Sequence, residues 1–105
     1  MVELNKDNFE AEVLQASGKV FVDFFGDGCV PCEAIYPFVV QMAEKYDGKI
    51  KFAKLNTTKA RRLSISQKIL GLPVMAIYEN GEKIEELIKD DATEANIEAM
   101  IQRHI

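Results

Sequence analysis

Two cysteines separated by two residues are the part of this sequence best suited to do chemistry. They are Cys29 and Cys32, in the segment Gly28-Cys29-Val30-Pro31-Cys32, and the chain has no other cysteine. Paired thiols at this spacing either cycle between dithiol and disulfide or supply half of a metal site. Because a loop this short constrains the unfolded chain very little, a purely structural crosslink is not expected.

The position of the pair at a strand-to-helix junction assigns different tasks to the two sulfurs. Cys29 falls at the start of a helix expected to run to about Tyr46, where free backbone N–H groups and the helix dipole favour a thiolate. Pro31 suits the first helical turn. Cys32 lies one turn further on and nearer the core. We therefore expect Cys29 to be the nucleophile and Cys32 the resolving thiol that breaks a mixed disulfide.

The main alternative for the cysteines is half of a zinc site. A closed zinc site needs four nitrogen or sulfur ligands, whereas the chain offers two cysteines and His104. A histidine near the end of a terminal helix is more typical of a solvated surface position. We expect no metal and no bound cofactor, with the Cys29–Cys32 disulfide as the redox group; a metal cluster shared between two chains stays open.

Asp23 is the second candidate because it interrupts an otherwise apolar strand. A buried ionised carboxylate is costly, and the usual relief is a raised pKa. Asp23 precedes Cys29 on a strand that runs toward it, so we expect it to exchange a proton with Cys32, directly or through water. Lys54, on the next strand, is the expected charged partner of Asp23. The alternatives are a solvent-facing Asp23 and a plain surface lysine.

The third candidate is the segment Gly71-Leu72-Pro73-Val74. The residue before a proline is restricted to extended geometry, and the bond between Leu72 and Pro73 can be cis. A proline at this place is more commonly a simple strand start. These residues alone therefore assign the segment no role.

Hydrophobic periods alternate between those of strands and helices, which predicts an α/β domain. Strands are expected at 2–4, 19–25, 50–56, 73–78 and 82–88, and helices near 7–16, 29–46, 57–70 and from 93 onward. The apolar strand 19–25 is expected at the centre of the sheet, and Asn80-Gly81 should form a type I′ turn.

Some positions carry specific expectations for the helices. Asp7 and Glu10 are expected to cap the first helix, and Pro37 to kink the second. The stripe expected to be buried on the second helix is Ile35, Phe38, Val39, Met42 and Ala43. The stripe expected on the last helix is Ile97, Met100, Ile101 and Ile105.

Composition limits the classes of function. The 105 residues are 48% hydrophobic and 29% charged, with a formal net charge of −4, which is typical of one soluble domain spanning residues 1–105. The acidic balance argues against nucleic acid and anionic lipid as partners. No apolar run suits a membrane span or an export signal, so we expect a cytoplasmic monomer.

A set of motifs, in order over nearly the whole chain, resembles the thioredoxin family. They are Val22-Asp23-Phe24-Phe25, Cys29-Val30-Pro31-Cys32, Pro37, Ala53-Lys54-Leu55-Asn56, Leu72-Pro73 and Asn80-Gly81-Glu82. The resemblance implies a thioredoxin fold, a five-stranded mixed β-sheet flanked by four α-helices, in an α/β protein that reduces protein disulfides and carries electrons. It also implies recycling by a flavin-containing thioredoxin reductase and a cis bond before Pro73.

The same resemblance implies a substrate-binding surface around the cysteines. Its members would be Gly28, Val30, Pro31, Leu72 and Pro73. The backbone of Leu72 would pair with an extended segment of the substrate in a short β-augmentation.

The rim of the site departs from the usual W-C-G-P-C pattern of the family. Gly28 and Phe25 stand where tryptophans are common, and Val30 replaces a glycine. Asp90 and Asp91 bring negative charge to a loop that is usually small and apolar. The Gly-Cys-Val-Pro-Cys variant is similar to thioredoxins of anaerobic, amino-acid-fermenting bacteria, so we expect an altered range of partners.

Two other functions fit the sequence less well. An oxidase or isomerase could use the same fold and cysteines, since the sequence does not fix the redox potential. A binding subunit could present the same surface without turnover.

Overall fold

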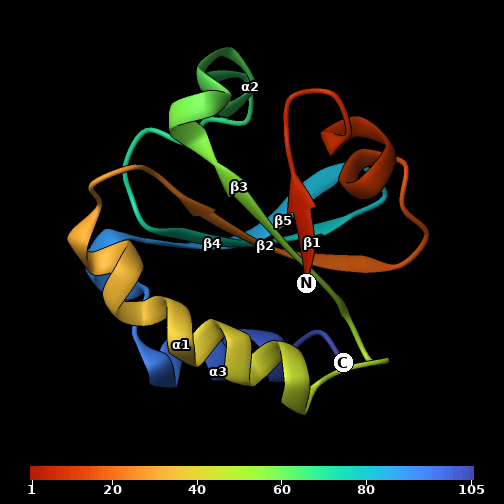
Figure 1. The fold of residues 1–105 in the computed structure, drawn as a ribbon. Coiled ribbons are helices and arrows are strands. Elements are labelled where there is room, and N and C mark those ends of the chain that lie inside the picture. The colour runs from red at the N-terminus through yellow and green to blue at the C-terminus, as the bar shows by residue number, and fades with distance from the viewer.

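Five strands form one mixed sheet in the order β1-β3-β2-β4-β5 (Figure 1). The computed structural model describes all residues 1–105. The strands are β1 (Val2–Leu4), β2 (Lys19–Phe25), β3 (Lys51–Asn56), β4 (Val74–Glu79) and β5 (Glu82–Ile88). The strand β3 pairs in parallel with β1 and β2, whereas β4 runs antiparallel to β2 and β5. The expected five-stranded mixed sheet and the central place of β2 are confirmed.

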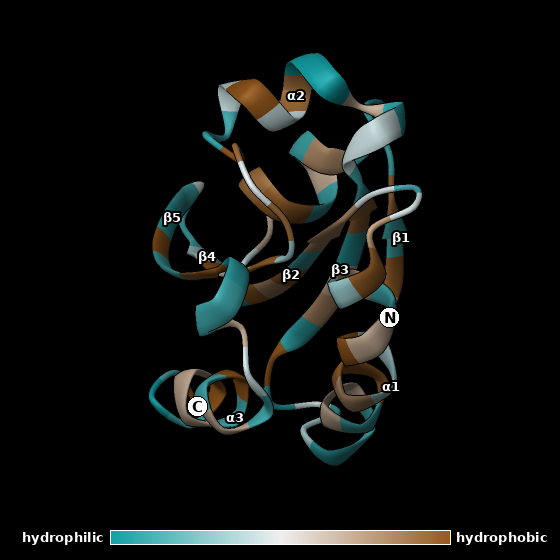
Figure 2. Ribbon diagram, turned by 90° about the vertical axis from the view of Figure 1, so that its left-hand side faces the viewer, coloured by the Kyte–Doolittle hydropathy of each residue, from teal (hydrophilic) through white to brown (hydrophobic).

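Four helices cover the two faces of the sheet. On one face lie α1 (Val30–Lys45) and α3 (Glu94–Gln102), and on the other lie α2 (Arg61–Ser66) and the short π-helix η1 (Glu10–Leu14) (Figure 1). Figure 2 shows the same layers from the side, with α2 above the sheet and α1 and α3 below it. No helix combines the length and the hydropathy that a membrane crossing requires.

Alternate residues of β2 feed two separate hydrophobic cores, as a strand covered on both faces requires. Val20, Val22 and Phe24 pack with Phe9 of the η1 side. Phe21 packs on the opposite face in the core beneath α1 and α3. The buried stripes predicted for these two helices are found there: Val39, Met42, Ile97, Met100 and Ile101 are buried, with Ile35, Phe38 and Ala43 packed against them.

The cap of the first helix differs from the prediction. The Oδ1 atom of Asn5 accepts hydrogen bonds from the backbone amides of Asp7 and Asn8, at 2.8 and 2.9 Å. Asn8 returns the contact, since its Oδ1 accepts from the Asn5 amide at 2.7 Å. The expected pair of Asp7 and Glu10 is therefore wrong, because an asparagine two residues earlier already supplies the acceptor.

The predicted helix over residues 57–70 is interrupted. A 3-10 helix, η2 (Thr57–Lys59), begins at Asn56, whose side chain accepts the Thr58 amide, and α2 starts only after Ala60. The backbone of Ala60 is not helical, with φ −146° and ψ 54°, and its side chain is buried in the core. A continuous helix is not formed, because burying Ala60 requires the chain to change direction.

Three further predictions concern the turn between β4 and β5, the proline within α1 and the last residue of the chain. Asn80 and Gly81 have φ values of 53° and 80°, which confirms the type I′ turn between β4 and β5. Pro37 lies inside α1, where it removes one backbone donor. Ile105 lies beyond the end of α3 and is 54% exposed, so its predicted burial is wrong.

Candidate active site

The two cysteines form a disulfide at the N-terminus of α1. Cys29 is the N-cap residue of the helix, and its Cα lies 5.3 Å from that of Cys32. The backbone amide of Cys32 donates a hydrogen bond to Sγ of Cys29 at 3.3 Å. A backbone donor and the positive end of the helix dipole are therefore directed at this sulfur, and both stabilise negative charge on it.

Exposure separates the two sulfurs. Cys29 is half-buried, whereas Cys32 is buried with 3% of its surface exposed. Only Cys29 can readily meet a disulfide of another protein, and Cys32 lies behind it within bonding distance. This is the asymmetry that a nucleophile and a resolving thiol require.

Asp23 is buried within β2 rather than facing solvent. Its side chain is 1% exposed, and its Oδ1 atom has no hydrogen-bond partner. Burial raises the pKa of Asp23 from 3.8 to about 7, and the positive charge of Lys54 opposes that rise. The solvent-facing alternative for Asp23 is thus excluded, and its carboxyl group can gain or lose a proton near neutral pH.

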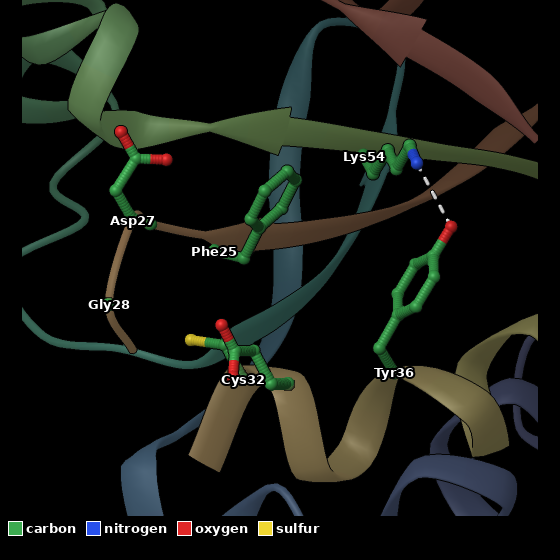
Figure 3. A pocket seen from close by; sticks show the side chains of 8 residues that line it. Phe25, Asp27, Gly28, Cys32, Tyr36 and Lys54 are labelled. Carbon is green, nitrogen blue, oxygen red and sulfur yellow. Dashed lines mark hydrogen bonds between the residues drawn. The ribbon is translucent and has the colours of Figure 1, made fainter. Parts of the chain in front are cut away.

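Lys54 is beside Asp23 along the sheet, but its ammonium group is directed elsewhere. The two residues are register partners on β2 and β3. No ion pair joins them, and Nζ of Lys54 instead donates a hydrogen bond to Oη of Tyr36 at 2.9 Å (Figure 3). The expected direct pair is replaced by an electrostatic interaction at longer range, and the hydrogen bond to Tyr36 raises the pKa of Lys54.

A cleft of about 360 Å³ opens beside Cys32 between α1 and the sheet (Figure 3). The residues that line it are Phe25, Gly26, Asp27, Gly28, Cys32, Glu33, Tyr36 and Lys54. The cleft therefore places Lys54 and Tyr36 on the same side of α1 as Cys32.

The segment before β4 lies next to the loop that carries the cysteines. The bond between Leu72 and Pro73 is cis, as the resemblance implied, and Pro73 is buried. The antiparallel pairing of Phe24 with Val74 places the segment at the end of β2. A Cβ atom at Gly26 would lie 2.9 Å from Cδ1 of Leu72, so only glycine fits there without a shift of the leucine.

The rim around the disulfide is both apolar and acidic. Val30 is 72% exposed, and Gly28 and Pro31 are also exposed. The 3-10 helix η3 (Lys89–Asp91) joins this rim, because the amide of Lys89 donates to the carbonyl of Pro73 at 2.8 Å. Its two aspartates, Asp90 and Asp91, are exposed and follow Lys89 directly, so the expected negative charge lies on the element that is hydrogen-bonded to Pro73.

His104 is not the solvated surface residue that the sequence suggested. Its side chain is 14% exposed and bridges two elements, with Nε2 at 2.8 Å from Glu85 and Nδ1 at 3.0 Å from Lys19. No three side chains of the types His, Cys, Asp and Glu converge where they could hold a metal ion.

A helix-capping, partly exposed cysteine joined to a buried one, on a five-stranded mixed sheet, defines a thiol-disulfide oxidoreductase. Comparison with known proteins identifies the family: the thioredoxin family model matches residues 1–103, and the chain belongs to the thioredoxin family. A thioredoxin of Peptoclostridium acidaminophilum is 59% identical over 105 residues, covering all of this chain and 96% of that protein.

Two further relatives agree with this assignment. A thioredoxin of Acetoanaerobium sticklandii is 55% identical over the full length of both chains. Thioredoxin C-2 of Corynebacterium nephridii is 30% identical over all of this chain and 96% of its own length. The protein is therefore a protein-disulfide oxidoreductase of the thioredoxin type with an atypical Gly-Cys-Val-Pro-Cys segment.

Two residues of this region, Tyr36 and Leu70, were not predicted from the sequence. Tyr36 follows Cys32 by four residues on a helix, a spacing that places both on one face and could have indicated it. Leu70, which is 84% exposed just before the cis-proline segment, has no comparable signal, because its exposure depends on where α2 ends.

Proposed function

We propose that this thioredoxin reduces disulfides of other proteins through the dithiol form of Cys29 and Cys32. The observation that carries the proposal is the difference in exposure of the two sulfurs at the N-terminus of α1. The thiolate of Cys29 attacks one sulfur of the substrate disulfide, and the other substrate sulfur leaves as a thiolate and takes up a proton. A mixed disulfide joins Cys29 to the substrate.

The second step closes the disulfide of the protein. Cys32 loses its proton and attacks Sγ of Cys29, which breaks the mixed disulfide and releases the second substrate sulfur as a thiol. The substrate disulfide has then gained two electrons from the two cysteines, one proton from solvent in the first step and one proton from Cys32 in the second. Asp23 accepts the proton of Cys32 and passes it on to the leaving sulfur, directly or through water.

The burial of Asp23 supports this proton transfer. A base with a pKa of about 7 exists in both forms near neutral pH, so it can take a proton in one step and return it in the next. Lys54 contributes through its charge, which holds the pKa of Asp23 below the value that burial alone would produce.

Substrates dock on the rim that Gly28, Val30 and Pro31 form with the Leu72–Pro73 segment. Leu72 precedes β4 and offers its backbone to an extended segment of the partner beside the disulfide. The exposed aspartates of η3 narrow the range of partners by repelling acidic surfaces.

We also propose the cellular setting. Residues 1–105 act as one domain, a cytoplasmic monomer in a bacterium that needs no bound cofactor and has neither nucleic acid nor membrane as a partner. A flavin-containing thioredoxin reductase restores the dithiol after each cycle, so the protein carries electrons for cell redox homeostasis. The bacterial sources of its relatives support this setting.

Trapping of the mixed disulfide tests the order of attack. A Cys32→Ser variant in the reduced form, mixed with an oxidised test protein such as insulin, should form an adduct that dithiothreitol releases. A Cys29→Ser variant should form far less adduct, because the remaining sulfur is buried. If the two single variants trapped equal amounts, or if Cys32→Ser trapped none, the assignment of the nucleophile would be lost.

The direction of the reaction needs a separate measurement. Equilibration of the protein with mixtures of reduced and oxidised glutathione gives its redox potential. A potential below that of the glutathione pool supports a reductase, whereas a higher potential would favour an oxidase or isomerase.

A further inference from the structure

The charged ends of Asp23 and Lys54 do not meet, although the two residues are neighbours in the sheet. As register partners on parallel strands, they direct their side chains to the same face. The Nζ atom of Lys54 is nevertheless 2.9 Å from Oη of Tyr36, on the helix that covers this face (Figure 3). The ammonium group is therefore bound to α1 rather than to the neighbouring strand.

Asp23 is the unsatisfied group in this arrangement. Its carboxyl group is 1% exposed, and Oδ1 accepts no hydrogen bond. An ammonium group in contact with a buried carboxylate stabilises the ionised form and promotes loss of the proton. The ammonium group of Lys54 binds the hydroxyl group of Tyr36 and therefore forms no ion pair with the carboxyl group of Asp23.

We propose that Tyr36 is a positioning residue of the active site, which holds the ammonium group of Lys54 away from the carboxyl group of Asp23. The consequence for catalysis rests on the proposed function: Asp23 keeps its capacity to hold a proton at neutral pH and can exchange it with Cys32. Without the hydroxyl group of Tyr36, Lys54 loses its hydrogen-bond acceptor on α1 and keeps only the contact with the ring, 4.9 Å from the ring centroid, so its ammonium group moves toward the unsatisfied carboxylate.

The ionisable groups on this face come from β3, β1, α1 and the loop before α1. Lys54 lies on β3 with Glu3 of β1 as its register partner, and the cleft beside Cys32 is lined by Glu33 and Tyr36 of α1 and by Asp27. The other helix on this face, α3, packs against the sheet through the apolar residues Ile97, Met100 and Ile101. The partner of Asp23 on β4 is Met75, which does not titrate. Lys54 is the cation of this set, so a change in its position acts directly on Asp23.

The oxidised protein is the suitable form for the test, because Cys29 and Cys32 do not titrate in the disulfide. The ¹³C resonance of the Asp23 carboxyl group, assigned by its loss in an Asp23→Asn variant, is followed against pH by NMR. In Tyr36→Phe the midpoint should fall by about one pH unit, which is a tenfold loss of proton affinity. The Tyr36→Phe substitution keeps the aromatic ring and its packing and removes only the hydroxyl group.

A matched control is available on the same helix. Tyr46 is the C-cap residue of α1, at the end of the helix opposite the disulfide, and its hydroxyl group donates to Glu98 of α3 at 2.6 Å. Tyr46→Phe removes the same atom from the same kind of residue and should leave the Asp23 midpoint unchanged. An equal shift in both variants would indicate a general effect on the helix and overturn the proposal.

A double-variant cycle shows whether Tyr36 acts through Lys54. Lys54→Gln should raise the Asp23 midpoint, because it removes the positive charge that opposes burial, and Tyr36→Phe should then have no further effect. An unchanged or raised midpoint in Tyr36→Phe alone, or the same fall in the absence of Lys54, would refute the proposed role.

Insulin reduction assays on the same proteins keep the two proposals distinguishable. If the parent protein reduced no disulfides, the proposed function would fail, while the NMR titration would still decide the role of Tyr36. If the parent is active, the acid limb of its pH profile should move to lower pH in Tyr36→Phe by the same amount as the Asp23 midpoint.

Discussion

Replacing Asp23 by asparagine should stabilise the protein in a strongly pH-dependent way. Asparagine has nearly the same shape as the protonated carboxyl group but cannot ionise. The carboxyl group of Asp23 is buried with Oδ1 unsatisfied, so the parent protein has an uncompensated charge at high pH and the variant does not.

The size of the effect follows from the pKa of Asp23. The pKa is about 7 in the folded protein and is 3.8 for an unperturbed side chain, a difference of about 3 units. Because the folded state binds the proton more tightly, the parent protein keeps its full stability below about pH 4 and loses it as the pH rises toward 7. At about 1.4 kcal/mol per unit, the loss reaches about 4 kcal/mol above neutrality.

Urea denaturation of the oxidised proteins measures this difference. The free energy of unfolding of Asp23→Asn should exceed that of the parent by a margin that grows by about 4 kcal/mol between about pH 4 and pH 9. Using the oxidised form removes any contribution from titrating thiols.

An exposed aspartate provides the control. Asp47→Asn, in the turn after α1, removes a carboxylate that water already solvates, so its effect on unfolding should stay small at every pH. If the difference between Asp23→Asn and the parent were the same at pH 4 and pH 9, the attribution of a raised pKa to burial would be refuted.

Three further substitutions test the packing and turns, each by urea denaturation. Phe9→Ala should lower the free energy of unfolding by about 3–5 kcal/mol, because the ring is 1% exposed and its centroid lies 6.3 and 5.9 Å from those of Phe24 and Tyr78. A loss below about 1 kcal/mol would mean that the core closes around the cavity and would contradict this prediction. Asn5→Ala should cost about 1 kcal/mol by removing the helix cap, whereas Asn5→Asp, which keeps the acceptor, should cost less. Gly81→Ala should cost about 1–2 kcal/mol, since its φ of 80° is strained for alanine; an unchanged stability would show that the turn relaxes.

Much of the fold could be predicted because its signals are local. The apolar run of β2 and the Asn80-Gly81 turn depend on residues close in sequence, and the structure confirms both. The stripe predicted for the last helix is confirmed at Ile97, Met100 and Ile101 but not at Ile105. The errors occur where a distant contact overrides a local preference. The helix expected over residues 57–70 is broken because Ala60 is drawn into the core between β3 and α2.

The sequence by itself determined the reactive pair. A short motif that joins a strand to a helix places Cys29 at a helix N-terminus and Cys32 one turn behind it, whatever the rest of the chain does. The same motif left open how the proton is managed, because Asp23 and Lys54 each had a plain surface interpretation.

Only the tertiary structure decided the environment of that pair. The burial of Asp23 depends on α1 lying over the sheet. Lys54 forms its hydrogen bond with the hydroxyl group of Tyr36 rather than with the carboxylate of Asp23, because the same helix places Tyr36 next to it. Desolvation and hydrogen-bond partners are properties of groups far apart in sequence, so no local pattern encodes them. The residues that exchange disulfides lie within the five-residue segment Gly28–Cys32. The residues expected to control the proton of Cys32 come from three elements, β2, β3 and α1, which only the fold brings together.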